Sequence, residues 1–283
     1  MPELPEVETV VRGLKRNLVG RKIVRFWTDW PRGVTPEPVK FNKLTRGAKI
    51  TEVSRRGKYI QIRIAQKGTP RVILGHLRMT GVFGFGNWTV KKGQAWAGKE
   101  PVRHLHTVLF LDRGEALGLS DVRKFATLSL DSPENIKDFL AARLGPEPIY
   151  KLDSGRLLPS LLSRKAPIKN ILLDQSFLAG IGNIYADEIL WRARISPLRR
   201  GRDLKAEEFK RVLLSAKAVL RKAIALRGTT MRDFRDTAGQ AGKYWEARAV
   251  YGRTDEACRR CRDKITRVVL GGRSSHFCKT CQI

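Results

Sequence analysis

The chain has 283 residues, of which 56 are Lys or Arg and 27 are Asp or Glu, so its formal net charge is +29. This excess indicates a polyanionic partner, and nucleic acid is favoured over an anionic membrane surface. The length is sufficient for two domains with buried cores. No apolar run approaches the roughly 18 residues of a membrane-spanning helix, and no signal-peptide pattern follows the first residue. The sequence therefore predicts a soluble, cytoplasmic protein.

The first residues combine a potential nucleophile with two acids. Removal of the initiator methionine would leave Pro2 as an N-terminal secondary amine. An α-amino group titrates at about pH 7.7–8.0, so a useful fraction is unprotonated at neutral pH. A secondary amine that attacks a sugar C1′ gives a cationic iminium, and Glu3 places a carboxylate beside it for proton transfer. Residues 5–18 then predict an amphipathic helix with Glu6 in its first turn. The alternative is a frayed terminus before an ordinary helix.

Residues 21–130 predict a β-rich region. Short apolar or alternating runs cover residues 58–64, 71–77, 107–111 and 125–130, separated by Gly, Pro and Asn. Such spacing is typical of a sandwich or barrel-like sheet. Residues 84–98, which are rich in Gly, Trp and Lys, predict an exposed loop. A helix is expected from Ser132-Pro133, and the Gly145-Pro146-Glu147-Pro148 segment predicts a linker.

The remainder is helical in pattern, which makes the predicted fold class α+β. Helices are expected over residues 157–162, 167–173, 183–193 and 205–227. A glycine-containing turn, Gly180-Ile181-Gly182, precedes Asn183. Backbone N–H groups at such a turn can bind phosphate, although Asn183 could also act simply as a helix cap.

The cysteines predict a metal site. Cys258 and Cys261 form one C-x-x-C pair, and Cys278 and Cys281 form a second pair after a gap of sixteen residues. In a reducing compartment this spacing is typical of a structural zinc site, and four thiolates leave no position for water. We therefore expect one structural zinc ion.

Several stretches together resemble bacterial formamidopyrimidine-DNA glycosylases, which excise oxidised purines. They are P-E-L-P-E-V-E-T at 2–9, R-R-G-K-Y at 55–59, H-L-R-M-T-G at 76–81, D-V-R-K-F at 121–125, L-A-G-I-G-N-I-Y at 178–185 and T-T-M-R-D-F at 229–234. The resemblance implies a catalytic β-sandwich domain over residues 1–132 and a helix and linker over 133–153. It also implies a helix–two-turns–helix DNA-binding domain over 154–254 and a four-cysteine zinc finger over 255–283. The family more often has Gly after the second cysteine, where this chain has Arg262.

The resemblance also assigns roles to residues. Met79 would enter the DNA stack, Arg123 would face the orphaned base, and Phe125 would wedge beside it, which offsets part of the cost of flipping a nucleotide. Lys58 would reach the active site and assist base loss. The predicted contacts to the DNA backbone come from His76, Lys169, Asn183 and Arg273, and Arg273 is also placed with the catalytic residues because it binds phosphates beside the flipped nucleotide.

The segment at 229–234 would close over the everted purine, with Thr229, Thr230, Arg232 and Phe234 as its site residues. Together with Leu4 and Val7, this match separates the chain from the related endonuclease VIII branch.

The sequence thus predicts a monomeric, bifunctional DNA glycosylase and abasic-site lyase of base excision repair. Its partner would be double-stranded DNA carrying 8-oxoguanine, a formamidopyrimidine or an abasic site. The reaction would proceed through a Schiff base at Pro2 and β,δ-elimination, with Glu3 transferring protons and Glu6 as a structural or electrostatic neighbour. Two alternatives stay open: an endonuclease VIII-like enzyme for oxidised pyrimidines, and a zinc-finger DNA-binding protein without catalytic activity.

Overall fold

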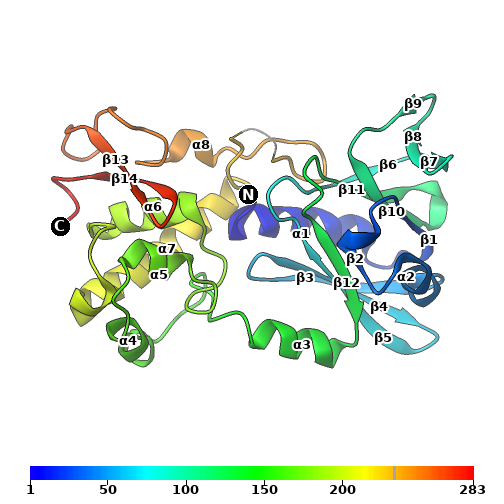
Figure 1. The fold of residues 1–283 in the computed structure, drawn as a ribbon, viewed down its shortest axis with the longest axis horizontal. Helices are drawn as coiled ribbons and strands as arrows, with labels where there is room; N and C mark the ends of the chain where they lie inside the picture. Colours follow the sequence, from blue (N-terminus) through cyan, green and yellow to red (C-terminus); the bar gives the residue numbers. More distant parts are fainter. Residues whose placement is uncertain (232–233) are drawn as a thin grey trace. The chain divides into compact units, whose positions relative to one another are not determined.

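The structure, a computed structural model of the chain, describes residues 1–231 and 234–283 (Figure 1). These residues form two compact units. The first unit contains Met1–Ala141 and Arg227–Gly242, and the second contains Ala142–Leu226 and Lys243–Ile283. The first unit therefore includes a segment from late in the sequence, whereas the division expected from the sequence was contiguous.

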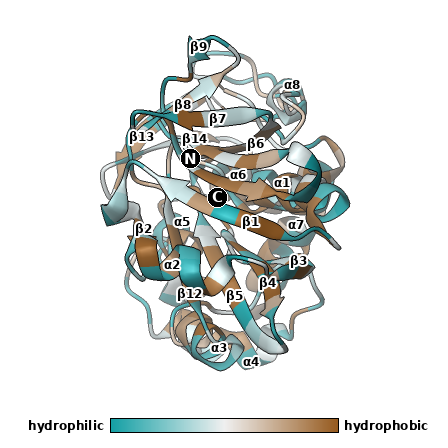
Figure 2. Ribbon diagram, turned by 90° about the vertical axis from the view of Figure 1, so that its right-hand side faces the viewer, coloured by the Kyte–Doolittle hydropathy of each residue, from teal (hydrophilic) through white to brown (hydrophobic). Residues whose placement is uncertain are grey.

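Two sheets form the body of the first unit. One sheet has the order β1 (Ile23–Thr28), β10 (Leu105–Leu111), β11 (Ala116–Ser120) and β6 (Val82–Gly86). The other has the order β2 (Val34–Thr35), β12 (Thr127–Asp131), β5 (Thr69–His76), β4 (Tyr59–Gln66) and β3 (Lys49–Arg56). One buried cluster draws side chains from both sheets, among them Ile62 and Leu109. Apolar and polar residues alternate along β4, and its buried positions alternate with less buried ones. Figure 2 shows hydrophobic segments along strands of these sheets, and the predicted β-sandwich is confirmed.

The N-terminal helix α1 (Leu4–Leu18) belongs to the same core. Its apolar residues recur at helical spacing and are buried, among them Val7, Val10 and Leu14. Pro5 fits the first turn because its missing N–H would have no partner inside the helix there. The helix packs against β3 and β4. This packing fixes the position of the N-terminal residues relative to the sheet.

The prediction of an exposed loop over residues 84–98 is wrong. Strands β7 (Trp88–Lys91), β8 (Gln94–Ala97) and β9 (Glu100–Pro101) form a small antiparallel sheet. Lys92 and Gly93 both have positive φ, 48° and 72°, which is the backbone that a two-residue hairpin requires. Trp88 packs against Gly118, where an added Cβ would lie 2.6 Å from the indole. Packing of apolar side chains against β10 and β11 therefore turned a polar-looking stretch into a sheet.

The predicted strands and the helix after Ser132 are present with shifted ends, and the unit also contains a helix and two short turns that the sequence did not predict. Helix α2 (Pro38–Thr45) lies between β2 and β3, and α3 (Pro133–Ala141) follows β12. Short 3-10 turns cover Pro31–Gly33 and Asp112–Gly114. The last predicted strand begins at Thr127 rather than at residue 125, because a side chain takes the backbone N–H groups of the two preceding residues.

The second unit is helical and ends in a hairpin. It contains α4 (Ser154–Leu162), α5 (Ile168–Leu173), α6 (Asn183–Ala193), α7 (Ala206–Ala225) and α8 (Tyr244–Ala247). A 3-10 turn spans Gly201–Asp203, and the strands are β13 (Ile265–Leu270) and β14 (Arg273–Cys278). The helices expected over 157–162, 167–173, 183–193 and 205–227 are all confirmed, and they share one core around Tyr185, Ile189, Phe209 and Leu220. Among the described residues, no helix is long and apolar enough to cross a membrane.

Candidate active site and nucleic-acid interface

The N-terminal acids are buried at the start of α1. Pro2 is buried, and Glu3 and Glu6 are 3% and 2% exposed. The carboxylate of Glu6 accepts the backbone N–H of Glu3 at 2.8 Å and that of Thr229 at 2.6 Å. Glu6 therefore ties the N-terminus to the late segment 227–242. Both lie in the first unit.

The late segment lies along α1. At Gly228, which has φ +77°, an added Cβ would lie 2.6 Å from the Glu6 carboxylate. Further along, Gly13 of α1 leaves room for Thr237, whose hydroxyl oxygen would clash with a Cβ there. Phe234 packs against the core of the unit. Gly228 and Thr237, which lie on either side of residues 229–234, therefore both contact α1 closely, and each contact includes a glycine.

Two threonines shape this segment further. Thr230 donates its hydroxyl to the carbonyl of Phe234 and accepts the backbone N–H of Gly242 at 2.8 Å each. Thr229 is buried. Arg232 lies outside the described residues. The structure therefore gives Thr229, Thr230 and Phe234 a role in folding the segment, beside any contact with a base.

Lys58 lies in the turn between β3 and β4, as the sequence predicts, and is 6% exposed. The guanidinium of Arg55 secures this turn, since it donates to the carbonyl of Gly57 at 2.8 Å and pairs with Glu8 of α1 at 3.1 Å. Burial by itself raises the pKa of Glu8, but hydrogen bonds and charges from Arg55 and Arg12 outweigh it and lower that pKa. The turn that carries Lys58 is therefore tied by an ionic contact to the first turns of α1.

His76 ends β5 and is neutral near physiological pH. Burial lowers its pKa to about 3, assisted by the charges of Arg78 and Lys58. The backbone N–H of Arg78 donates to its Nδ1 at 2.9 Å. In a neutral ring whose Nδ1 accepts, the proton is on Nε2. In the DNA-free protein His76 is therefore a neutral ring that carries its N–H on Nε2.

Met79, Arg123 and Phe125 come together at the tips of two loops. A guanidinium nitrogen of Arg123 lies 3.0 Å from the sulfur of Met79, and its Cζ lies 4.6 Å from the centre of the Phe125 ring. Met79 and Phe125 are 44% and 48% exposed, which is unusual for large apolar side chains. The arrangement presents two apolar groups with a hydrogen-bonding cation between them, which is what filling a gap in a base stack requires.

Asp121 holds the Arg123–Phe125 loop, a role that the sequence analysis missed. Its carboxylate accepts the backbone N–H groups of Arg123 at 3.1 Å, Phe125 at 2.6 Å and Ala126 at 2.7 Å. The hydroxyl of Thr80, next to Met79, donates to the same carboxylate. One buried carboxylate thus joins both loops. An Asp directly before a turn of polar residues is the signal that could have indicated it.

The four cysteines of the second unit fit a zinc ion. All four Sγ atoms lie within 4.8 Å of one another, and two of the pairs are 3.4 and 4.0 Å apart. Tetrahedral zinc with Zn–S bonds of about 2.3 Å places the sulfurs roughly 3.8 Å apart. Backbone N–H groups of Arg260 and Cys281 also point at cysteine sulfurs, each at 3.4 Å, as befits thiolate acceptors. Arg262 has φ +72°, so the position where the family more often has Gly is left-handed here.

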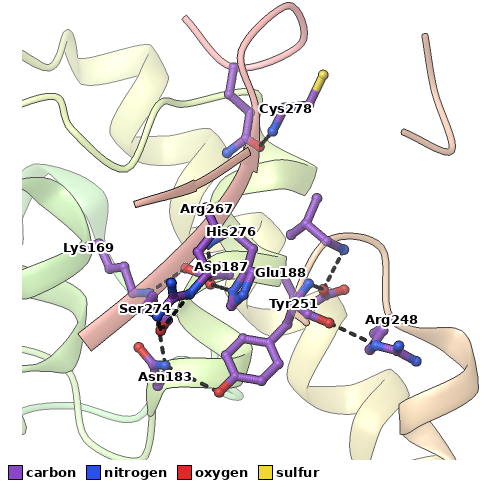
Figure 3. A network of polar contacts seen from close by, with 12 residues as sticks. Lys169, Asn183, Asp187, Glu188, Arg248, Tyr251, Arg267, Ser274, His276 and Cys278 are labelled. Carbon is purple, nitrogen blue, oxygen red and sulfur yellow. Dashed lines mark hydrogen bonds and ion pairs between the residues drawn. The ribbon is translucent and has the colours of Figure 1, made fainter. Parts of the chain in front are cut away.

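Arg273 begins β14, directly after a turn in which Gly271 and Gly272 both have positive φ. Its side chain is exposed. Lys169, in contrast, is completely buried, with its Nζ 2.7 Å from Asp187 and 2.6 Å from the carbonyl oxygen of Ser274. The Nδ2 of Asn183 lies 3.2 Å from the same carbonyl (Figure 3). The two predicted backbone-binding residues Lys169 and Asn183 therefore converge on the hairpin that carries Arg273.

The chain is similar to known proteins over its whole length. The pattern of the formamidopyrimidine-DNA glycosylase N-terminal domain matches residues 1–128, that of the H2TH domain of these glycosylases matches 144–235, and that of a zinc finger found in FPG and IleRS matches 255–283. The formamidopyrimidine-DNA glycosylase of Herpetosiphon aurantiacus is 44% identical over 100% of both chains. That of Streptococcus pneumoniae is 36% identical over 100% of this chain and 99% of its own.

Solved structures agree in fold. Lactococcus lactis Fpg in complex with DNA containing N7-benzyl-Fapy-dG superposes with a TM-score of 0.89 at 35% identity, covering 99% of both chains. The complex of the same enzyme with abasic-site DNA gives a TM-score of 0.89 at 34% identity, again over 99% of both. A β-sandwich led by a helix with proline in its first turn, a helical unit and a four-cysteine hairpin define a DNA repair glycosylase with one structural zinc. The chain belongs to the formamidopyrimidine-DNA glycosylase family.

Proposed function

We propose that the chain excises oxidised purines, such as 8-oxoguanine and formamidopyrimidines, from duplex DNA and then cleaves the strand at the resulting abasic site. The observation that carries the proposal is the burial of Pro2 and Glu3 at the start of α1, against which the segment 227–242 is held through Glu6. The proposal follows because the Pro2 nitrogen, which removal of Met1 would free as an amine, the Glu3 carboxylate and the backbone of Thr229 all lie beside the first turn of α1. The relatives whose structures contain Fapy-dG or abasic DNA support the same substrates.

In the proposed reaction, the Pro2 nitrogen, freed by removal of Met1, attacks C1′ of the everted nucleotide. The bond from C1′ to the base breaks, and the base leaves with a proton supplied by the active site. Glu3 transfers the proton that opens the sugar ring and gives the iminium. Loss of a proton from C2′ then expels the 3′ phosphate, loss of a proton from C4′ expels the 5′ phosphate, and water hydrolyses the remaining Schiff base to release the Pro2 amine. Lys58 assists base loss from the turn between β3 and β4.

The remaining site residues prepare the DNA. Met79, Arg123 and Phe125 fill the space left by the flipped nucleotide, and Thr229, Thr230, Arg232 and Phe234 cover the base. His76, Asn183 and Arg273 contact the sugar-phosphate backbone. The proposed protein acts as a monomer on DNA in the bacterial cytoplasm.

The test is capture of the iminium. Borohydride added to the mature protein with duplex containing 8-oxoguanine should give a stable cross-link that mass spectrometry maps to Pro2. A variant that retains Met1 should not cross-link through Pro2, because an amide nitrogen has no basic lone pair. Glu3→Gln should keep the amine but slow excision, because an amide does not shuttle a proton.

The outcome separates the alternatives. A cross-link that maps to Lys58, or one that forms equally well with Met1 retained, would show that the nucleophile is another residue. Absence of any cross-link, with tight DNA binding intact, would favour the zinc-finger binding protein. Faster release of oxidised pyrimidines than of 8-oxoguanine would favour the endonuclease VIII-like activity.

A further inference from the structure

The carbonyl group directly after Arg273 receives two side-chain donors from the helical part of the second unit. Lys169 of α5 donates from Nζ at 2.6 Å, and Asn183 at the start of α6 donates from Nδ2 at 3.2 Å, both to the carbonyl oxygen of Ser274 (Figure 3). The hairpin is also held by its own β-ladder and by Cys278, which belongs to the four-cysteine cluster. The backbone beside Arg273 is therefore fixed by α5 and α6 as well.

The second anchor is Asp187 of α6. One of its oxygens lies 2.7 Å from the Nζ of Lys169, and the other accepts the backbone N–H of His276 at 2.8 Å. The Nδ1 of His276 lies 3.1 Å from that second oxygen. Lys169 and Asp187 are each 0% exposed. A single buried ion pair thus joins α5, α6 and β14.

The two anchors act on the same edge of β14. In the register of the hairpin, Leu270 pairs with Arg273 across the turn, so residues 273, 275 and 277 exchange hydrogen bonds with β13. The C=O of Ser274 and the N–H of His276 consequently point away from β13. A strand edge with unpaired groups needs other partners, and here Lys169, Asn183 and Asp187 supply them. The contacts at Ser274 and at His276 therefore fix the position and orientation of β14.

The turn before Arg273 is also close to α5. At Gly271, which has φ +54°, an added Cβ would lie 2.9 Å from the side-chain nitrogen of Asn170. Neighbouring Glu188 of α6 has a different function, since it accepts the backbone N–H groups of Ala249, Val250 and Tyr251 before the first cysteine pair. Glu188 therefore holds residues 249–251, and of these two carboxylates Asp187 is the one that contacts the strand beginning with Arg273.

We propose that Asp187 and Lys169 are positioning residues for Arg273. Their ion pair sets where the hairpin presents the guanidinium to DNA phosphate, and Lys169 adds no net charge to phosphate binding because Asp187 neutralises it. The inference rests on the proposed phosphate contact of Arg273.

The salt dependence of DNA binding tests this role. Each phosphate contact adds about 0.9 to the slope of log affinity against log salt on duplex DNA. The probe is a duplex with a tetrahydrofuran abasic analogue, which cannot be cleaved, and binding is followed by fluorescence anisotropy across a salt series. Arg273→Ala should make the slope shallower by about 0.9. Lys169→Met should cause the same change, and the Lys169→Met/Arg273→Ala double variant should lose no more than either single variant.

Asp187→Asn distinguishes two roles of Lys169, positioning Arg273 and contacting phosphate directly, because the two roles predict different changes in the salt slope. If the ion pair positions Arg273, Asp187→Asn should also make the slope shallower. If Lys169 itself contacts phosphate, removing its counter-charge should leave the slope unchanged or steeper, and the double variant above should lose about 1.8. Glu188→Gln is the matched control, because it neutralises the adjacent buried carboxylate and should leave the slope unchanged.

Bound zinc, measured by elemental analysis, shows whether each variant keeps the finger. If Asp187→Asn loses zinc, the Lys169→Met/Asp187→Leu variant replaces the whole buried pair by apolar groups, which buried pairs often tolerate, and it should show the same shallower slope. An unchanged slope for Arg273→Ala would overturn the phosphate contact itself. If Arg273→Ala makes the slope shallower by about 0.9 but Lys169→Met leaves it unchanged, only the positioning role is overturned. Neither result bears on whether Pro2 forms the iminium, because capture with borohydride tests that separately.

Discussion

Replacing Asp121 by Ala should free the loop that carries Arg123 and Phe125. The carboxylate accepts three backbone N–H groups and the hydroxyl of Thr80. A hydrogen bond to a charged group contributes about 1.5–3 kcal/mol when it is buried. Only the bond from the Ala126 N–H is fully buried, so the other three count for less. We expect a loss of about 3 kcal/mol in the stability of the first unit.

The effect on function should exceed the effect on general binding. With the loop free, Arg123 and Phe125 no longer hold one geometry beside Met79, and we expect single-turnover excision of 8-oxoguanine to fall about tenfold, or about 1.4 kcal/mol. Affinity for undamaged duplex should change little, since phosphate contacts dominate it. An excision rate equal to that of the unaltered protein, in a variant whose thermal unfolding is clearly lowered, would refute the reasoning that this carboxylate prepares the wedge.

The pH dependence provides a second check on the same carboxylate. Burial alone would raise the pKa of Asp121, but hydrogen bonds from Thr80 and from the backbone lower it below its ordinary value of 3.8. A group with a depressed pKa in the folded state stabilises the fold above its unfolded pKa and loses this contribution as pH falls through the folded value. The stability difference between the unaltered protein and Asp121→Ala should therefore be constant above about pH 5 and shrink below about pH 4.

Four further outcomes follow from the structure. Cys258→Ser should abolish zinc retention and DNA binding together, because the metal folds the hairpin, and elemental analysis with anisotropy measures both; folded, active protein without zinc would contradict this. Arg262→Gly should raise the thermal midpoint, corresponding to about 1 kcal/mol, because left-handed backbone costs a residue with a side chain roughly that much and Arg262 has φ +72°; a lowered midpoint would show that the arginine side chain matters more. Phe125→Ala should reduce lesion excision more than affinity for undamaged duplex, and equal losses would argue against a wedge. Deleting residues 229–234 should impair 8-oxoguanine excision but spare cleavage at a preformed abasic site, whereas matched losses would assign the segment to folding.

The sequence by itself determined the local features of this protein. Helical periodicity located α1 and the four longest helices of the second unit within a few residues, because burial of one helix face leaves a pattern in the chain. The cysteine spacing indicated zinc, since each C-x-x-C pair places two ligands close together within a short stretch of chain. The family resemblance named Pro2, Glu3 and the DNA-contacting residues as candidates without placing them.

Only the tertiary structure showed which residues distant in sequence pack together or bind the same carboxylate. The Trp88 hairpin was misread as a loop because its stability comes from packing on β10 and β11, which local composition does not encode. The carboxylate of Asp121 joins two loops, and that of Glu6 joins α1 to the segment after α7. Lys169 looks like a surface lysine until Asp187, eighteen residues later, is found beside its buried ammonium. A charged side chain is buried only where other groups pair with it or hydrogen-bond to it, and those groups come together only when the chain is folded.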